Sequence, residues 1–587
     1  MRTPFLPTLC AVALSLLPAG FARADEAASL RALFATEWEY TMEQSPTWAS
    51  SLGDRRWNDR WSDLRVEHLE QQAEHDRGYL KKLEAFNRAK LPPEERVNLD
   101  LAKYQAQLAI DDYAQRLWTL PVNQREGVQL IDEFGDSLRF ETLKDYEDWI
   151  ARLRSLPELI EQTTALMRLG IAEKRTHARA VLAGVPAQIG KQLVDKPEES
   201  AFFKPFQKYP ANIASADRER LTSAAKEAIA QSVVPAYRRF QEFFNKEYLP
   251  ACTEAVGAWQ WPDGNAAYAF LARKYTTTNM TPEEIHQLGL REVERITGEM
   301  QQVMDRVGWK GTRQEFFDHL RHDPQFYYKT PEELLEAYRA QSKIIDPTLV
   351  KLFKTLPRIP YGVEPIPAKS APNTTAAYYR PLAADGSRAG TFFVNLYRPQ
   401  MRPKYEMMAL ALHESVPGHH FQFALAFEQT GLPNFRRYGG EGSYTAFIEG
   451  WALYSESLGD ELGLYEDPYA KFGQLTYEIW RACRLVVDTG IHAKHWTRQQ
   501  AIDYLLDHSA KTELDVENEI DRYISWPGQA LGYKIGELKI KELRARAKAK
   551  LGDKFDVRDF HDVVLKNGAL PLEVLERNVD DWIKGPA

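Results

Sequence analysis

The chain has 587 residues, 44% of them hydrophobic, and a formal net charge of −8 from 75 basic and 83 acidic residues. The hydrophobic fraction is ample for a sizeable folded core, and the small charge imbalance argues against a nucleic-acid partner. Beyond the N-terminus there is no apolar run of ~18 residues, so we expect no membrane-spanning helix.

The N-terminus has the pattern of a cleavable export signal. Arg2 supplies a positive charge, residues 6–17 are apolar, and Ala22-Arg23-Ala24 is a small-residue cleavage site. The apolar run is too short to span a bilayer. We therefore predict that residues 1–24 are removed and that the mature chain, starting near Asp25, is periplasmic or secreted.

Two cysteines are left in the mature chain, Cys252 and Cys483. In an exported protein they could form one disulfide, and two buried free thiols account for them equally well. Their spacing is not that of metal ligands.

Helical patterns cover most of the chain. Residues 27–44 carry apolar side chains at a helical spacing, including Leu30, Phe34 and Trp38. Two capping boxes with proline in the first turn begin helices after Thr281 and Thr330. Further helices are expected from Pro92-Pro93 onward, over 446–458 and 469–489, after Thr497, and over 515–524, where Trp526-Pro527-Gly528 ends the last one.

Prolines become frequent between residues 354 and 403, where the one clear β element lies. Tyr378-Tyr379 and residues 391–396 have the composition of strands. A strand edge beside a catalytic helix can bind an extended peptide through main-chain hydrogen bonds, with Asn395 as a side-chain contact. A ribbon with a structural role only fits the pattern equally well.

The most informative segment is His413-Glu414-Ser415-Val416-Pro417-Gly418-His419-His420, inside an apolar run from Met407 to Phe427. Imidazole nitrogens bind zinc, and an adjacent carboxylate can take a proton from water that the metal activates. Burying these polar groups without a partner would cost free energy. We therefore predict a catalytic zinc site with His413 as a ligand and Glu414 as the general base.

The spacing of the histidines differs from the H-E-x-x-H pattern, in which two ligands lie four residues apart. Here position i+4 is Pro417, and the next histidines follow at i+6 and i+7. On an ideal helix a residue at i+7 lies about 10 Å along the axis, too far to share an ion. Proline and glycine can break the helix and return a histidine to the first one. We predict His420 as the second ligand, with His419 as the alternative.

A third ligand is expected from a neighbouring helix, because catalytic zinc usually has three protein ligands and water. Glu449 is the best candidate, as an acid in an apolar stretch beside Gly450, which permits close helix packing. Glu456 lies at i+7 on the same face and could orient a ligand histidine.

Hydrolysis of a peptide also needs a donor for the oxyanion and a group that holds the substrate. Tyr533, which follows a turn and a glycine, is the predicted donor. Arg522 is the predicted substrate-binding arginine, with Arg481 and Arg484 as further candidates, because guanidinium binds carboxylate in a bidentate manner. Arg484 could instead pair with Asp488 on its own helix.

Together these segments resemble the bacterial domain-of-unknown-function 885 family. The resemblance covers nearly the whole mature chain, and its specific segments are HESVPGHHFQ (413–422) and WPGQALGYKIG (526–536). Weaker matches are residues 51–54 and 276–290, and residues 447–454 belong to the pattern as well. The family is similar to helical zinc peptidases of the angiotensin-converting-enzyme, neurolysin and Taq-carboxypeptidase type.

This resemblance implies a mostly helical body with a deep channel and a small sheet beside the active-site helix. It implies His413 as first ligand, Glu414 as base and Glu449 as third ligand, with His420 in the place of the second ligand if three residues are inserted. The family name brings no substrate with it.

We therefore expect a mainly α, zincin-like protein with one domain over residues 25–587, divided into an N-terminal helical half (25–270) and a catalytic half (271–587). The predicted function is Zn²⁺-dependent hydrolysis of short peptides, by a carboxypeptidase or dipeptidyl carboxypeptidase. The alternatives are a zinc hydrolase of other amides or esters, and a catalytically silent peptide-binding protein. The sequence does not indicate an oligomeric state.

Overall fold

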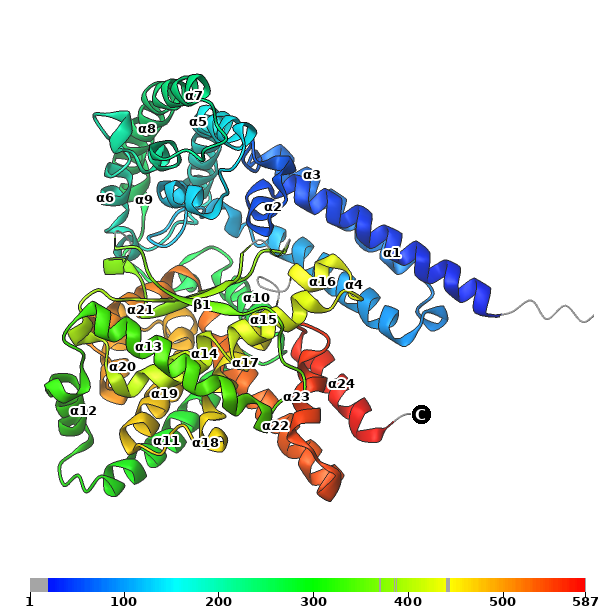
Figure 1. The fold of residues 1–587 in the computed structure, drawn as a ribbon, viewed down its shortest axis with the longest axis vertical. Helices are drawn as coiled ribbons and strands as arrows, with labels where there is room; N and C mark the ends of the chain where they lie inside the picture. Colours follow the sequence, from blue (N-terminus) through cyan, green and yellow to red (C-terminus); the bar gives the residue numbers. More distant parts are fainter. Residues whose placement is uncertain (1–18, 369–370, 385, 387, 440–443, 586–587) are drawn as a thin grey trace, which may run out of the picture.

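The computed structural model describes residues 19–368, 371–384, 386, 388–439 and 444–585. These residues are mainly α-helical and include one three-stranded sheet, as the sequence predicts. In Figure 1, helices α5 to α9 form the top of the molecule, α1 and α3 run along one side, and α11 to α24 build the lower part.

The helices fall into an N-terminal and a C-terminal series. The N-terminal helices are α1 (Ala19–Gln44), α2 (Pro46–Leu52), α3 (Val66–Glu84), α4 (Pro93–Ala114), α5 (Leu143–Ala172), α6 (Val185–Gly190), α7 (Ser215–Ala228), α8 (Val234–Phe243) and α9 (Leu249–Ala251). The others are α10 (Gly264–Thr276), α11 (Pro282–Arg306), α12 (Arg313–His322), α13 (Pro331–Ile345), α14 (Met407–Glu414), α15 (His419–Glu428), α16 (Asn434–Tyr438), α17 (Thr445–Ser457), α18 (Gly459–Leu462), α19 (Pro468–Ala493), α20 (Arg498–His508), α21 (Glu513–Ser525), α22 (Gly532–Leu551), α23 (Val557–Leu565) and α24 (Leu572–Lys584).

The helix boundaries follow the local signals in the sequence. Thr281 and Thr330 form the predicted capping boxes, each accepting a hydrogen bond from the backbone of the glutamate three residues later. Thr497 caps α20 in the same way with Gln500. Helix α21 ends where Trp526-Pro527-Gly528 begins, because proline cannot continue the helical hydrogen bonds.

The sheet has the order β1-β3-β2. Strand β3 (Gly390–Val394) pairs in parallel with β1 (Tyr361–Pro365) and antiparallel with β2 (Ala377–Arg380). The two predicted strands are therefore confirmed, whereas β1 was missed because Pro360, just before it, and Pro365, its last residue, resemble turn residues. Strand β2 lies at one edge of the sheet, beside α14, with which it is in contact.

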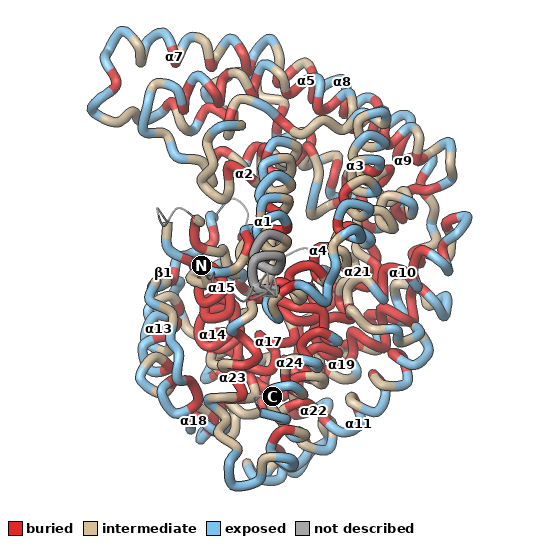
Figure 2. Tube along the Cα trace, turned by 90° about the vertical axis from the view of Figure 1, so that its right-hand side faces the viewer, coloured by how far each residue is buried: buried red, intermediate tan, exposed pale blue. Residues whose placement is uncertain are grey.

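The hydrophobic core consists of two large clusters. One joins α5, α7 and α8 to α11, α12, α19 and α21, and thus includes side chains from both predicted halves of the chain. The other surrounds α14, α15, α17 and α22 and packs against the sheet. Figure 2 shows that the most deeply buried stretches run through α14, α17 and α19, which cross the centre of the molecule.

The described residues contain no helix that is both long and apolar enough to cross a membrane. Residues 1–18 of the predicted export signal lie outside the described part of the chain. Cys252 and Cys483 are both buried free thiols, so the disulfide alternative is wrong for this structure.

Candidate metal centre

The histidine segment breaks between two buried helices, as the Pro-Gly pair predicts. Helix α14 ends at Glu414, and α15 begins at His419. Ser415 has φ −103° and ψ −108°, and Gly418 has φ −74° and ψ −129°, so neither continues the helix. The carbonyl of Pro417, which lies in the break, accepts a hydrogen bond of 2.7 Å from the indole of Trp451 on α17.

Gly418 permits the close return of the chain after the break. A Cβ atom at this position would lie 1.9 Å from the carbonyl oxygen of His413 and 2.4 Å from that of Leu412. Both neighbours are backbone atoms at the end of α14, so they cannot move aside without moving the helix. The tight return is what places α15 directly beside the end of α14.

We expect Gly418→Ala to destabilise the protein by more than about 3 kcal/mol, at the upper end of the cost of overpacking, because the added methyl displaces α14 or α15. Chemical denaturation of the two proteins measures the difference. Gly431→Ala is the matched control, since a Cβ there meets no atom within 4 Å. If the denaturation midpoint of Gly418→Ala equalled that of the unaltered protein, the chain would not pass as close to the end of α14 as the structure indicates.

Three side chains converge at this break: His413 from α14, His419 from α15 and Glu449 from α17. Their ligand atoms all lie within 4.8 Å of one another. The Oε2 atom of Glu449 is 3.5 Å from Nε2 of His413 and 3.4 Å from Nε2 of His419. The two imidazole rings are perpendicular, with centroids 4.8 Å apart. Within the described residues, this is the one group of three or more such side chains placed to share an ion.

The donor set fits zinc. Two ligand atoms that each lie ~2.0–2.1 Å from a tetrahedral ion stand about 3.4 Å apart, close to the separations from Glu449 to the two rings. Oε2 of Glu449 is buried and has no hydrogen-bond partner among the described residues. An unpaired buried carboxylate oxygen is costly, and a cation between it and the two imidazoles would remove that cost.

Glu456 holds the ring of His413 from the other side. Its Oε1 atom lies 2.8 Å from Nδ1 of His413, and its side chain is fully buried. Nδ1 therefore carries the proton that is donated to Glu456, which leaves Nε2 free to bind a metal. The predicted orienting role of Glu456 agrees with this contact.

The surroundings of His413 favour a positive charge. Burial alone would lower the pKa of its imidazole, but the carboxylates of Glu449 and Glu456 outweigh burial and raise this pKa to about 9. The same attraction would act on a metal cation in place of the proton.

The structure does not bring His420 to this group, and its prediction as the second ligand is wrong on geometry. Its Nδ1 atom is 3.0 Å from the hydroxyl of Tyr379 on β2, and its Nε2 atom is 3.0 Å from the carbonyl oxygen of Ile359. Burial lowers the pKa of His420 to about 4, so the ring is neutral. Its two nitrogens tie α15 to strand β2 and to the segment that precedes β1. His419, the alternative, occupies the position beside His413 instead.

Close packing of α17 against α22 brings Glu449 to the group. A Cβ atom on Gly450 would lie 2.5 Å from Gly536 of α22, and one on Gly536 would lie 1.7 Å from the carbonyl of Ala446. The two glycines therefore let the helix axes approach closely. The expected role of Gly450 is confirmed.

The three side chains lie on the wall of a cavity of about 390 Å³. Glu414, the predicted base, lines the same cavity, as do residues 375–379, which include the start of edge strand β2. Two further predicted residues, Tyr533 and Arg522, are also part of this wall. The cavity therefore unites every predicted site residue except His420, Asn395 and Glu456, which contacts His413 without lining the cavity.

Tyr533 and Arg522 form a bonded pair. The Nη2 atom of Arg522 donates to the hydroxyl oxygen of Tyr533 at 3.2 Å. Because the oxygen accepts this bond, the hydroxyl proton is available to another acceptor, such as an oxygen in the cavity.

Asn395 is not a cavity residue, and its predicted contact with substrate is wrong. Its side chain is 1% exposed, and its amide nitrogen donates to the carbonyls of Ala371, Thr374 and Thr375. It thereby fixes the turn before β2. The residue supports the cavity wall instead of facing the cavity.

Sequence reasoning missed Arg125 and Trp480, which also line the cavity. Arg125 comes from the N-terminal half of the chain, between helices and outside any motif, so no local signal identifies it. Arg484 pairs with Glu519 instead of the predicted alternative Asp488, which accepts hydrogen bonds from Tyr268 and from the backbone of Gly528.

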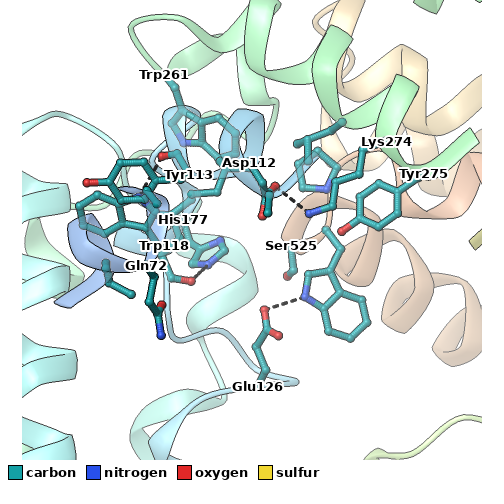
Figure 3. Close-up of a pocket in the computed structure, with 18 of the residues that line it drawn as sticks. Gln72, Asp112, Tyr113, Trp118, Glu126, His177, Trp261, Lys274, Tyr275 and Ser525 are labelled. Atoms are coloured by element: carbon teal, nitrogen blue, oxygen red, sulfur yellow. Dashed lines mark hydrogen bonds and ion pairs between the residues drawn. The ribbon is translucent and has the colours of Figure 1, made fainter. Parts of the chain in front are cut away.

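A second cavity, of about 440 Å³, lies beyond Trp526, which borders both cavities. Figure 3 shows it between Tyr113 and Trp118 on one side and Tyr275 on the other. Its polar groups are largely paired: Lys274 with Asp112 at 2.7 Å, and Glu126 with the indole of Trp526 at 2.8 Å. It is larger than the first cavity but holds no comparable group of metal-binding side chains among the described residues.

The comparisons with known proteins agree with the fold but assign no chemistry. The family model of bacterial proteins of unknown function, DUF885, matches residues 46–579. A crystal structure from Colwellia psychrerythraea, of a protein provisionally described as a lipoprotein, has 31% identity and a TM-score of 0.88, covering 96% of this chain and all (100%) of that one.

A second structure, from Shewanella oneidensis, is of a protein provisionally described as a lipoprotein of unknown function. It has 17% identity and a TM-score of 0.69, and covers 94% of this chain and 100% of its own. At this identity the likeness shows the fold alone. No curated protein matches the sequence.

Proposed function

The chain belongs to DUF885, a bacterial family of unknown function, and we propose that it is a zinc-dependent hydrolase of short peptides, acting as a carboxypeptidase or dipeptidyl carboxypeptidase. The observation that carries this proposal is the buried carboxylate oxygen of Glu449, which has no hydrogen-bond partner among the described residues and lies between the Nε2 atoms of His413 and His419. A metal ion accounts for all three atoms, and Glu414 lines the same cavity.

The residues of the cavity match the steps of peptide hydrolysis. Zinc bound by His413, His419 and Glu449 would polarise the substrate carbonyl and lower the pKa of a water molecule. Glu414 takes the proton of the attacking water and passes it to the leaving nitrogen. Tyr533 donates a hydrogen bond from its hydroxyl group to the oxygen on which negative charge develops. Glu456 keeps the ring of His413 in its ligating orientation.

The edge strand at the border of the cavity favours an extended peptide as the ligand. Strand β2 is an edge strand, and residues 375–379 border the cavity. Main-chain groups on an unpaired strand edge can bond to a peptide laid beside them, whatever its side chains. Export of the mature chain, predicted from the N-terminal segment, is supported by the description of the Colwellia psychrerythraea relative as a lipoprotein. Export would place the enzyme where it meets peptides outside the cytoplasm.

The test is digestion of a mixed library of short peptides, with free and blocked ends, by the zinc-loaded protein. The expected result is cleavage near the carboxyl end that a chelator stops and added zinc restores. Acylated amino acids and simple esters belong in the same panel, because a metal site of this kind can hydrolyse them too. If those compounds are cleaved and no peptide is, the choice of substrate is overturned. If cleavage survives full removal of metal, the mechanism is overturned.

A further inference from the structure

One wall of the catalytic cavity is rich in arginine. Arg484 comes from α19, Arg522 from α21 and Arg125 from the segment that follows α4. Arg484 and Arg522 are 3% and 8% exposed, and the ring of Tyr533 stacks on Arg484, with the guanidinium carbon 4.2 Å from the ring centre. The wall therefore gathers three guanidinium groups from parts of the chain that are distant in sequence.

A single carboxylate faces these three groups. Glu519 accepts hydrogen bonds from Arg484 at 3.1 Å and from Arg522 at 3.2 Å. Nη1 of Arg484 is buried and has no hydrogen-bond partner among the described residues. The single negative charge of Glu519 therefore faces the positive charges of Arg125, Arg484 and Arg522. Uncompensated charge in a buried site is costly unless an anion is supplied.

Arg125 is held so that its side chain can reach this wall. The side chain of Asn123 accepts hydrogen bonds from the backbone of Arg125 at 2.8 Å and of Glu126 at 3.2 Å, which forms a tight turn. On either side, Gln124 bonds to the backbone of Asp521 at 3.1 Å and Glu126 accepts from Trp526. The turn is thus fixed to the end of α21.

The guanidinium of Arg125 has no hydrogen bond to the protein within the described residues, although it lines the cavity. Burial and the neighbouring charge of Arg522 lower the pKa of Arg125, against the attraction of Glu519. A guanidinium group whose backbone is fixed and whose nitrogens have no partner in the protein is suited to a bidentate contact with a planar anion.

We propose that Arg125, Arg484 and Arg522 form a subsite that binds the free terminal carboxylate of a peptide substrate, with Arg125 supplying the charge that Glu519 does not neutralise. This inference rests on the proposed function, because it makes the cavity select peptides by their carboxyl end. The bond that is cut is then set by the distance from this subsite to the group formed by His413, His419 and Glu449. The subsite is assembled across both halves of the chain.

The test measures binding, so that turnover is not needed. Calorimetry on the Glu414→Gln protein compares one short peptide as its free acid and as its terminal amide. The free acid should bind at least about tenfold more tightly than the amide. This factor corresponds to one hydrogen bond between charged groups, which the amide cannot form. Arg125→Met should remove most of this preference, and Arg125→Lys should retain part of it. Arg577→Met, which changes an exposed arginine on α24, should leave the preference intact.

Equal binding of acid and amide, or a preference unaffected by Arg125→Met, overturns the subsite. A second peptide carries an amidated end and an acidic last side chain. If it binds as tightly as the free acid, the subsite does not recognise the terminal carboxylate. These failures differ from failure of the proposed function: hydrolysis without selectivity for the acid removes the subsite alone, whereas Arg125-dependent selectivity without hydrolysis of any peptide removes the proposed function alone.

Discussion

Glu414→Gln should reduce peptide hydrolysis by about 10²- to 10⁴-fold, the usual contribution of a positioned general base, while zinc stays bound. Glutamine has nearly the shape of glutamate but cannot take a proton at neutral pH. Glu414 is not among the three side chains whose atoms converge on the ion position, so its replacement leaves the ligand set unchanged. The measurement is kcat/KM on a cleaved peptide, together with the zinc content of the same samples.

Glu428→Gln is the matched control, because Glu428 ends α15 but bonds to Arg358 outside the cavity. Its kcat/KM should equal that of the unaltered protein. If Glu414→Gln retained full activity, Glu414 would not be the base. If it lost zinc as well, the loss of activity would say nothing specific about proton transfer, and the ligand set would have to include this residue.

His419→Ala should weaken zinc binding by more than about 100-fold, whereas His420→Ala should leave it nearly unchanged. Removing a residue that only orients a ligand already costs 10–100-fold in metal affinity, so removing a ligand should cost more. His420 holds α15 to Tyr379 of strand β2 and to Ile359, just before β1, so its loss should lower the melting temperature without releasing metal. Competition with a zinc chelator measures the affinity, and calorimetric unfolding measures the stability.

The pair of variants provides its own control, because the two histidines are adjacent in sequence and both are buried. A larger loss of zinc from His420→Ala than from His419→Ala would contradict the geometry of the group. Equal small losses from both would indicate that neither ring binds the ion.

The sequence predicts the helical class, the capped helix starts and the break at Pro417-Gly418, because each depends on local chemistry. Proline removes a backbone donor, and glycine allows the backbone of α15 to pass close to the end of α14. His413 and Glu449 are predicted for a related reason: acids and histidines in apolar helices need a partner, and here Glu449 lies beside His413 and His419. Glu414 is predicted from its position next to His413 in the sequence.

The choice between His419 and His420 depends on the direction in which α15 leaves the break, and no local pattern sets that direction. Every residue of α15 up to Phe427 is buried, so the helix has no polar face that would indicate which side meets the cavity. Asn395 was misplaced for a similar reason, because strand composition does not tell a turn-fixing amide from an exposed one. Arg125 reaches the cavity through tertiary packing against α21, which a single sequence does not reveal.

Anomalous diffraction at the zinc absorption edge, from crystals of the purified protein grown with zinc, tests the central claim most directly. We expect one strong peak at a point ~2.0–2.2 Å from Nε2 of His413, Nε2 of His419 and Oε2 of Glu449. The absence of a peak between these three atoms, or a peak beside His420 instead, would contradict the account.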